Sequence, residues 1–237
     1  MMIRPATPAD EPAIVAVNTS AFFEEGLLGA CIHPHRHQYP TDVAIFFHGR
    51  IRADFHEPRN RLIVATVIEN GTEKIAGAAT WQRQGDDAGA RTIMKQWQDP
   101  GPDAFAALQR TENRAIDPSK ANILAEAYPF FKHHWDPMTN GLSRRQNWYL
   151  RVCAVHKDYA GRGIGRELVQ WGLDRAREEN VHASVTSSFE NEKFYLRCGY
   201  DEIVGNCSEG EGNPLAKTGV PGGDILFMWA KERKVDG

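Results

Sequence analysis

The sequence predicts an α/β (α+β) fold, in which helices flank a central, mixed and mostly antiparallel sheet of six to seven strands. Three observations support this prediction. Two β-branched runs joined by Asn70-Gly71 predict an antiparallel hairpin. An apolar run at 148–155 leads through a glycine-rich turn into an amphipathic helix. A segment with helical patterning, at 82–147, separates these two units.

The N-terminal part of the chain is expected to form a strand, two helices and the hairpin. Residues 3–7 form the first strand, and Thr7-Pro8-Ala9-Asp10 then provides a helix cap with proline near the first helical position. One helix continues to about Phe23, and a second spans 42–55 and ends near Pro58. The hairpin strands cover 61–67 and 74–81.

The stretch 82–147 is predicted to be a helical insertion between the third and fourth strands. Glycine and proline breakers surround helical material at 103–114, and another helix starts at Asp117-Pro118 and is kinked or ended by Pro129. Either the insertion caps a ligand pocket or its helices simply pack on the sheet. The aromatic residues that raise this question are Trp97, Phe105, Tyr128, Phe130, Phe131 and Trp135.

The C-terminal part repeats strands and helices. After the strand at 148–155, the turn and its helix, we expect a strand at 183–189, a short helix at 191–198, and strands at 200–204 and 225–230. Residues 205–224 contain many glycines, Pro214 and Pro221, which predicts a mobile loop with no core of its own. All of this is expected to form one domain over residues 1–237.

Composition narrows the possible partners and location. Apolar residues make up 41% of the 237, and 28 basic and 31 acidic residues give a net charge of -3, so nucleic acid is not expected as a partner. The four cysteines form no CxxC pair, and the N-terminus lacks a secretory signal, which favours a cytoplasmic location. No apolar run is long enough for a membrane span.

The turn from Tyr159 to Arg166 has the chemistry of a diphosphate cradle. Gly161, Gly163 and Gly165 remove side chains where an anion must approach the main chain, and the helix that follows directs N–H groups and its positive dipole end there. The alternative is a tight strand-to-helix connection. A Walker loop and a Rossmann fingerprint are both disfavoured, because Arg166-Glu167 follows Gly165 and the glycine spacing differs.

The segment 152–165 resembles the central motif of GCN5-related N-acetyltransferases, the GNAT superfamily. That motif is Gln/Arg-x-x-Gly-x-Gly/Ala between an apolar strand and an amphipathic helix, and its glycines match Gly163 and Gly165. Ala160 departs from the pattern at the Gln/Arg position. A second block, 191–200, is similar to the family's Phe-Tyr-x-x-x-Gly-Phe segment. The resemblance implies the GNAT fold.

The resemblance also implies direct transfer of an acetyl group from acetyl-coenzyme A to a primary amine, without an acyl-enzyme. Tyr195 matches the residue that protonates the leaving thiolate, although a core aromatic with a satisfied hydroxyl is the alternative. The strand would splay from its neighbour, so that its main chain binds the pantetheine arm and polarises the thioester. The residues implied to bind the cofactor are Cys153, Ala154, Val155, Gly161, Arg162, Gly163, Ile164, Gly165, Arg166 and Asn191.

The base that deprotonates the acceptor is left open, since the strand 148–155 contains no carboxylate. A water chain is one alternative, and the candidate side chains are Glu24, Glu25, Glu126, His133 and His134. Cys153 is expected to pack rather than to act as a nucleophile. His33, His35 and His37 are expected to contact the acceptor, and no metal site is predicted.

The expected partners are therefore acetyl-coenzyme A and an amine acceptor, with homodimer formation left open and no membrane or nucleic acid. The aromatic insertion favours a small-molecule acceptor, because a long cap obstructs the open groove that a peptide needs. A peptide or protein acceptor is the alternative within the same chemistry. A non-catalytic acyl-coenzyme A binding module is the alternative from a different class.

Overall fold

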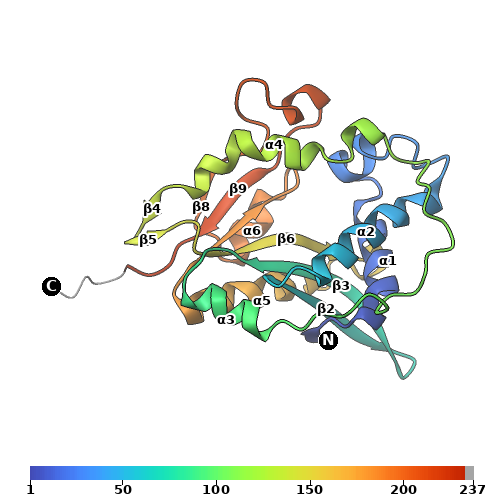
Figure 1. Cartoon of the computed structure of the whole chain (residues 1–237), viewed down its shortest axis with the longest axis horizontal. Coiled ribbons are helices and arrows are strands. Elements are labelled where there is room, and N and C mark those ends of the chain that lie inside the picture. Colours follow the sequence, from blue (N-terminus) through green and yellow to red (C-terminus); the bar gives the residue numbers. More distant parts are fainter. Residues whose placement is uncertain (233–237) are drawn as a thin grey trace.

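The central feature of the fold is a seven-stranded sheet that is antiparallel except between β6 and β7 (Figure 1). The computed structural model describes residues 1–232. The predicted fold class, a mixed and mostly antiparallel sheet flanked by helices, is confirmed. In spatial order the strands are β1 (Met2–Pro5), β2 (Asn60–Glu69), β3 (Thr72–Arg83), β6 (Asn147–Val155), β7 (His182–Thr186), β9 (Asp224–Met228) and β8 (Glu202–Asn206).

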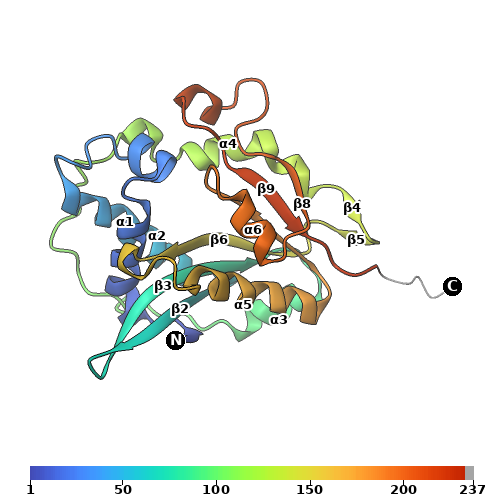
Figure 2. The ribbon, with the colours of Figure 1, turned by 180° about the vertical axis from the view of Figure 1, so that it is seen from behind.

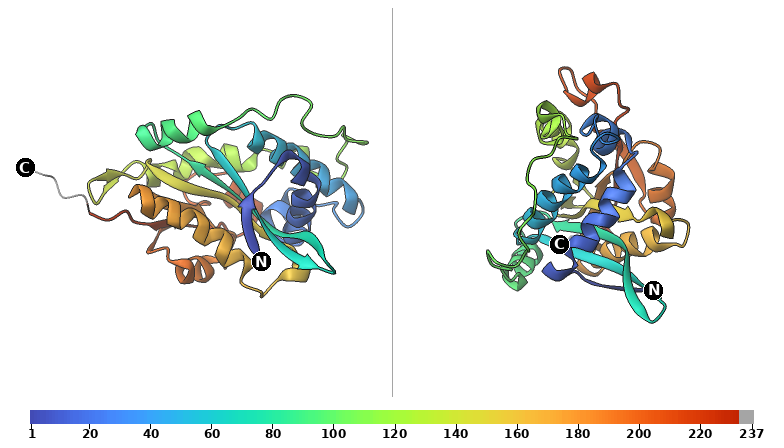
Figure 3. Two further views of the ribbon diagram at one scale, coloured as in Figure 1. Left: turned by 90° about the horizontal axis from the view of Figure 1, so that it is seen from below. Right: turned by 90° about the vertical axis from the view of Figure 1, so that its right-hand side faces the viewer.

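Helices cover both faces of this sheet (Figure 3). On one face α1 (Glu11–Phe22) and α2 (Val43–Phe55) share an apolar core with β2, β3 and β6, and α4 (Ile123–Phe131) shares one with β9. On the other face α5 (Ile164–Glu179) buries its apolar side, and α6 (Glu192–Cys198) lies next to it (Figure 2). Strand β6, which contains the start of the 152–165 motif, therefore contributes to the apolar cores on both faces of the sheet.

Local sequence signals place most elements where they were expected. Asn70 and Gly71 both adopt positive φ, 50° and 76°, as the predicted two-residue hairpin turn requires. Pro129 lies inside α4, and that helix ends at Phe131, where a 3-10 turn (Lys132–Trp135) follows. Beyond it two short strands, β4 (Met138–Thr139) and β5 (Leu142–Ser143), form a hairpin within the insertion.

The predicted helix at 103–114 is wrong. The insertion's first helix is instead α3 (Ala88–Gln96), which Asp87 caps by accepting hydrogen bonds from the N–H groups of Gly89 and Ala90. The stretch 103–114 runs over α2, where its side chains make long-range contacts. Arg114 pairs with Asp42 at 2.7 Å, for example. These tertiary contacts, rather than helix propensity, fix this segment.

The glycine-rich segment 205–224, predicted to be a mobile loop with no core of its own, packs into an apolar cluster formed by other elements. Cys207 and Leu215 are buried in the same apolar cluster as α4, Ile225 and Phe227. Because α4 and this segment share a core, they form one continuous wall above β9 (Figure 1).

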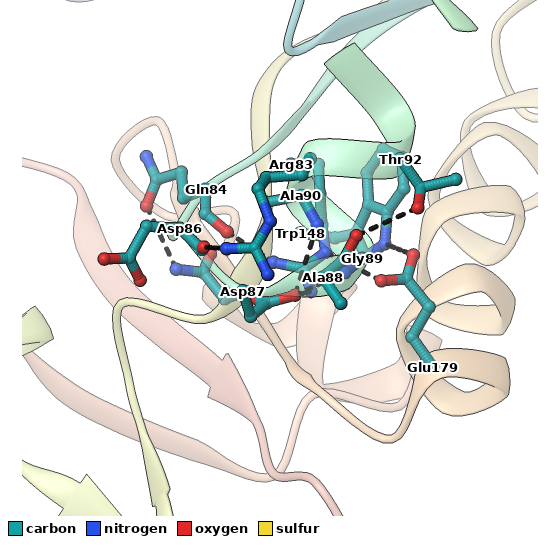
Figure 4. Close-up of polar contacts among 12 residues, drawn as sticks. Arg83, Gln84, Asp86, Asp87, Ala88, Gly89, Ala90, Thr92, Trp148 and Glu179 are labelled. Atoms are coloured by element: carbon teal, nitrogen blue, oxygen red, sulfur yellow. Dashed lines mark hydrogen bonds and ion pairs between the residues drawn. The ribbon is translucent and has the colours of Figure 1, made fainter. Parts of the chain in front are cut away.

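A buried arginine fixes α3 to the far end of α5 (Figure 4). Arg83, 1% exposed, donates to Glu179 at 2.9 Å and to Asp87 at 2.8 Å, and also to the carbonyl of Gln84. The Trp148 indole N–H donates to the second oxygen of Glu179 at 2.8 Å. Burial alone would raise the pKa of Asp87, but Arg83 and two N–H groups hold it below its usual range. This clamp ties β3, β6, α3 and α5 together.

Within residues 1–232 no helix combines the length and apolar character needed to cross a membrane.

Candidate functional site

The two parallel strands of the sheet diverge halfway along β6. The last residue pair between β6 and β7 is Leu150 with Val185, yet β6 continues to Val155. β7 ends at Thr186, and not at Phe189 as predicted, because the chain turns away there. The main-chain groups of 151–155 that face β7 therefore have no strand partner, as the predicted splay requires.

A β-bulge marks the start of this splay. In the register with β3, Thr80 is opposite Val152 and Trp81 is opposite Leu150, so Arg151 is the extra residue on β6. A bulge bends its strand and redirects the side chains that follow it. Cys153 consequently packs in the α5 cluster and Ala154 in the α1–α2 cluster.

A cavity of about 690 Å³ occupies the gap between the diverging strands. Its walls are formed by segments far apart in the sequence: the loop after α1, α2, α4, the residues after β7, and the segment before β9. Cys153 and Tyr195 lie in its lining. The apolar lining includes Leu27, Leu28, Leu124, Tyr128, Phe131 and Trp135, and the charged lining consists of Glu25, Arg50, Asp54 and Arg151.

The glycine turn at the end of β6 presents main-chain donors to solvent. Gly161 and Gly163 have φ of 75° and 80°, a conformation that other residues rarely adopt, and Gly163 caps α5. Gly165 has a different role, since a Cβ there would lie 3.3 Å from the Phe194 ring. Within the described part of the chain, the N–H groups of 161–166 have no backbone acceptor. This is the geometry of an anion site at a helix N-terminus.

Two arginines flank this turn. Arg162 folds back, with its guanidinium over the Tyr159 ring at 5.1 Å and one N–H donating to the Asp158 carbonyl at 3.3 Å. Arg166 is exposed on the first turn of α5, next to the buried Ile164. Both add positive charge to the field of the helix N-terminus.

Tyr195 lies under the cavity, on α6. Its side chain is 8% exposed, and its ring packs edge-on against Phe194 and Tyr200. Burial raises the pKa of the Tyr195 phenol well above its usual value, and the nearby thiol of Cys153 adds to the shift. The phenol therefore remains protonated at neutral pH, which is the state that a proton donor needs.

Burial raises the pKa of Cys153 to about 12. Its sulfur lies 3.9 Å from the carbonyl oxygen of Gly165, on the α5 side of the sheet. A thiol in this state is a poor nucleophile, which agrees with the packing interpretation.

Asn191 precedes α6 and is exposed. Its carbonyl accepts from the N–H groups of Phe194 and Tyr195, at 3.1 and 3.4 Å. Asn191 thus positions the helix that carries Tyr195. It does not line the cavity.

Of the five base candidates, only Glu25 lines the cavity, and its Oε2 already accepts from the N–H groups of Leu27 and Leu28 at 3.0 and 2.6 Å. Glu24 pairs with Arg36 at the surface, and Glu126 is exposed. The other two, His133 and His134, both contact Glu209 outside the cavity.

The histidines at 33, 35 and 37 do not converge. His33 is fully buried, donates through Nδ1 to the Leu28 carbonyl at 2.6 Å, and has a pKa lowered by burial. His35 and His37 are exposed, and none of the three lines the cavity, so their positions do not support the predicted contact with the acceptor. Among residues 1–232, the group with metal-ligand geometry is a different one, His133, His134 and Glu209.

The aromatic residues of the insertion fall into two groups, one that lines the cavity and one that packs elsewhere. Tyr128, Phe131 and Trp135 line the cavity. The other three pack elsewhere: Trp97 donates to the Phe55 carbonyl, Phe105 contacts the Phe55 ring, and Phe130 lies against Gly210.

Three charged residues of the cavity lining were not identified from the sequence. Arg50 and Asp54 stand four residues apart on α2, a spacing that puts both on one helix face. Arg151 is a charged residue within an apolar strand. These signals are present in the sequence, but the strand bulge that brings the three together is not.

Comparisons with known proteins agree with this geometry. Residues 123–200, which include β6, the glycine turn, α5 and α6, match the model of the Acetyltransferase (GNAT) family. A Corynebacterium glutamicum structure described as histone acetyltransferase HPA2 and related acetyltransferase is 20% identical, with TM-score 0.59 and coverage of 99% of this chain and 98% of that one. An N-acetyltransferase from Staphylococcus aureus Mu50 is 15% identical, with TM-score 0.52 and coverage of 96% and 100%. No curated protein matches the sequence.

Proposed function

We propose that this protein is an N-acetyltransferase, which transfers the acetyl group of acetyl-coenzyme A directly to a primary amine of a small molecule. The match of residues 123–200 to the Acetyltransferase (GNAT) family model supports this proposal. The observation that carries the proposal is the splay of β6 from β7, with the free N–H groups of 161–166 at its end and Tyr195 beneath it. The whole of residues 1–237 would serve as one transferase domain.

Each part of the site has a chemical task in this reaction. The main chain of Cys153, Ala154 and Val155 pairs with the pantetheine arm, as an added strand would, and polarises the thioester carbonyl. The turn from Gly161 to Arg166 holds the pyrophosphate. The neutral amine attacks the thioester carbon, the C–S bond breaks, and the Tyr195 phenol protonates the leaving thiolate.

The proton lost by the acceptor passes to water or to Asp54. Burial raises the pKa of this carboxylate despite the nearby charges of Arg151 and Arg50, so Asp54 has the higher proton affinity that a base requires. Glu25 is less suitable, because its Oε2 already accepts hydrogen bonds from two N–H groups.

The wall on one side of the cavity supports a small acceptor. The wall formed by α4 and 205–224 contributes Leu124, Tyr128, Leu215 and Pro221 to the lining. A peptide acceptor needs an open groove across the site, and this wall obstructs one.

The function is tested by measuring free-thiol release from acetyl-coenzyme A with a panel of primary amines, alongside thermal stabilisation by acetyl-coenzyme A. We expect a rise in melting temperature and amine-dependent release of thiol. Stabilisation without thiol release on any amine would favour a non-catalytic binding module. Release with lysine peptides alone would favour a protein acceptor.

The turn can be tested separately with Gly163→Ala. A Cβ at φ 80° costs about 1–2 kcal/mol, so the turn should relax away from the diphosphate. We expect roughly tenfold weaker coenzyme A binding by calorimetry, the equivalent of about 1.4 kcal/mol. The matched control is Gly49→Ala, where a Cβ meets nothing within 4 Å and φ is not positive. Equal affinity in the two variants would remove the turn from the cofactor site.

A further inference from the structure

One part of the cavity contains more positive than negative charge. There, α2 contributes Arg50 and Asp54, and the bulge of β6 contributes Arg151. Arg151 lies 3.3 Å from a carboxylate oxygen of Asp54, and the same oxygen accepts from the Asn60 amide at 3.1 Å. One carboxylate thus stands beside two guanidinium groups.

Arg50 has no hydrogen bond or ion pair within residues 1–232. Its guanidinium lies 5.4 Å from the centre of the Phe46 ring, and burial lowers its pKa. The acidic groups that act on Arg50 are Asp54 and the Tyr149 phenol. Asp54 is already paired with Arg151, and burial raises the pKa of Tyr149, which keeps that phenol neutral.

The other negative charge in the lining does not compensate Arg50. Glu25 lies in the loop after α1, where its carboxylate caps the next turn through the N–H groups of Leu27 and Leu28. Arg50 is partly buried in the cavity wall. Partial burial of a guanidinium without an ion-pair partner is unfavourable, and a ligand anion would offset that cost. The planar guanidinium is well suited to a carboxylate, with which it can form two parallel hydrogen bonds.

The anion is not the diphosphate of coenzyme A. Arg151 stands where the splay begins, whereas the glycine turn follows the opposite end of the unpaired part of β6. The cofactor's phosphates and the arginine pair, Arg50 and Arg151, therefore lie at the two ends of the site.

We propose that Arg50 and Arg151 bind a carboxylate carried by the amine acceptor, so that the enzyme acetylates amino carboxylic acids. This inference rests on the proposed N-acetyltransferase function. Its physical basis is the guanidinium of Arg50, which lies over the Phe46 ring but has no ion pair within residues 1–232, on the wall of the cavity that Tyr195 also lines.

The test compares each acceptor with its own carboxamide. Thiol release is measured for a panel of α- and ω-amino acids and for the corresponding amino amides, with the wild type and with Arg50→Met. We expect Arg50→Met to lower kcat/KM for the accepted amino acid by about 30-fold, mainly through KM, and to lower kcat/KM for the amide much less. Because amidation also changes the basicity of an α-amine, the quantity to compare is the acid-to-amide ratio across variants. Arg50→Lys should retain part of the preference.

Stability provides a second readout. Since Arg50 has no hydrogen bond or ion pair within residues 1–232, Arg50→Met should melt close to the wild-type temperature, whereas Arg151→Met should melt lower because it removes the ion pair of Asp54. Arg91→Met is the matched control, with the same loss of charge at an exposed site on α3 outside the cavity. Its acid-to-amide ratio should equal that of the wild type.

Binding without turnover distinguishes failure of this inference from failure of the proposed function. In the presence of coenzyme A, calorimetric titration with 3-phenylpropionate and with 3-phenylpropionamide needs no amine. Preferential binding of the carboxylate, abolished by Arg50→Met, would support the inference even if no amine is acetylated. An acid-to-amide ratio, in turnover or in binding, that Arg50→Met leaves unchanged would overturn it.

Discussion

Tyr195→Phe is expected to lower kcat by about 10²- to 10⁴-fold, the usual contribution of a positioned proton donor. The phenol lines the cavity beside Cys153, and the ring packing that holds it involves no hydroxyl. The variant should therefore fold normally and bind coenzyme A with wild-type affinity. Steady-state thiol release and calorimetric titration measure the two quantities.

Tyr200→Phe is the matched control for this variant. Tyr200 is buried next to Tyr195, but it does not line the cavity, and its hydroxyl has no hydrogen-bond partner in the described structure. Removing that hydroxyl should leave kcat unchanged and should not destabilise the protein. If both variants retained wild-type kcat, the proton-donor role would be lost.

The Tyr195 phenol also determines how the rate should depend on pH. Burial raises the pKa of Tyr195 well above 10, so the phenol keeps its proton through neutral and mildly alkaline pH. The wild-type rate should therefore rise with pH as the acceptor amine loses its proton, with no fall below about pH 10. A decline that begins near pH 8 would assign proton donation to a different group.

The largest expected effect on stability comes from Arg83→Met. The variant leaves Asp87 and Glu179 without their buried partner, and removing one member of such a network costs about 3–5 kcal/mol. Since the two carboxylates are 22% and 26% exposed, we expect a value of about 3 kcal/mol. Urea unfolding of the wild type and the variant at pH 7 measures the difference.

The stability that Arg83 contributes through Asp87 depends on pH. Because the folded-state pKa of Asp87 is lowered, its contribution is present above the ordinary aspartate pKa and is lost as pH falls through the folded value. The difference in the free energy of unfolding between the wild type and Arg83→Met should therefore become smaller at acidic pH. Arg177→Met is the control, since the half-exposed Arg177–Asp174 pair within α5 is worth about 0.5 kcal/mol at most. Similar losses in both variants would contradict the clamp.

The sequence by itself determined the elements whose conformation depends on neighbouring residues. Asn70-Gly71 favours a turn with positive φ at both residues, and such a turn joins the two flanking β-branched strands into a hairpin. Gly161 and Gly163 likewise have the positive φ that a glycine pair permits, and the amphipathic pattern after them forms α5. The fold class and the position of the glycine turn were thus predictable from local chemistry.

Other features were decided only by tertiary contacts. The segment 103–114 has helical composition, yet Asp42 and α2 hold it in an irregular path, and Leu215 brings the glycine-rich segment into the core. The bulge at Arg151 is visible only in the pairing of β6 with β3. At this bulge Arg151 contacts Asp54, which belongs to α2. The glycine turn proposed to bind the cofactor is formed by consecutive residues, whereas the proposed acceptor site is assembled from residues far apart in the chain. A local sequence pattern cannot specify how such distant residues come together.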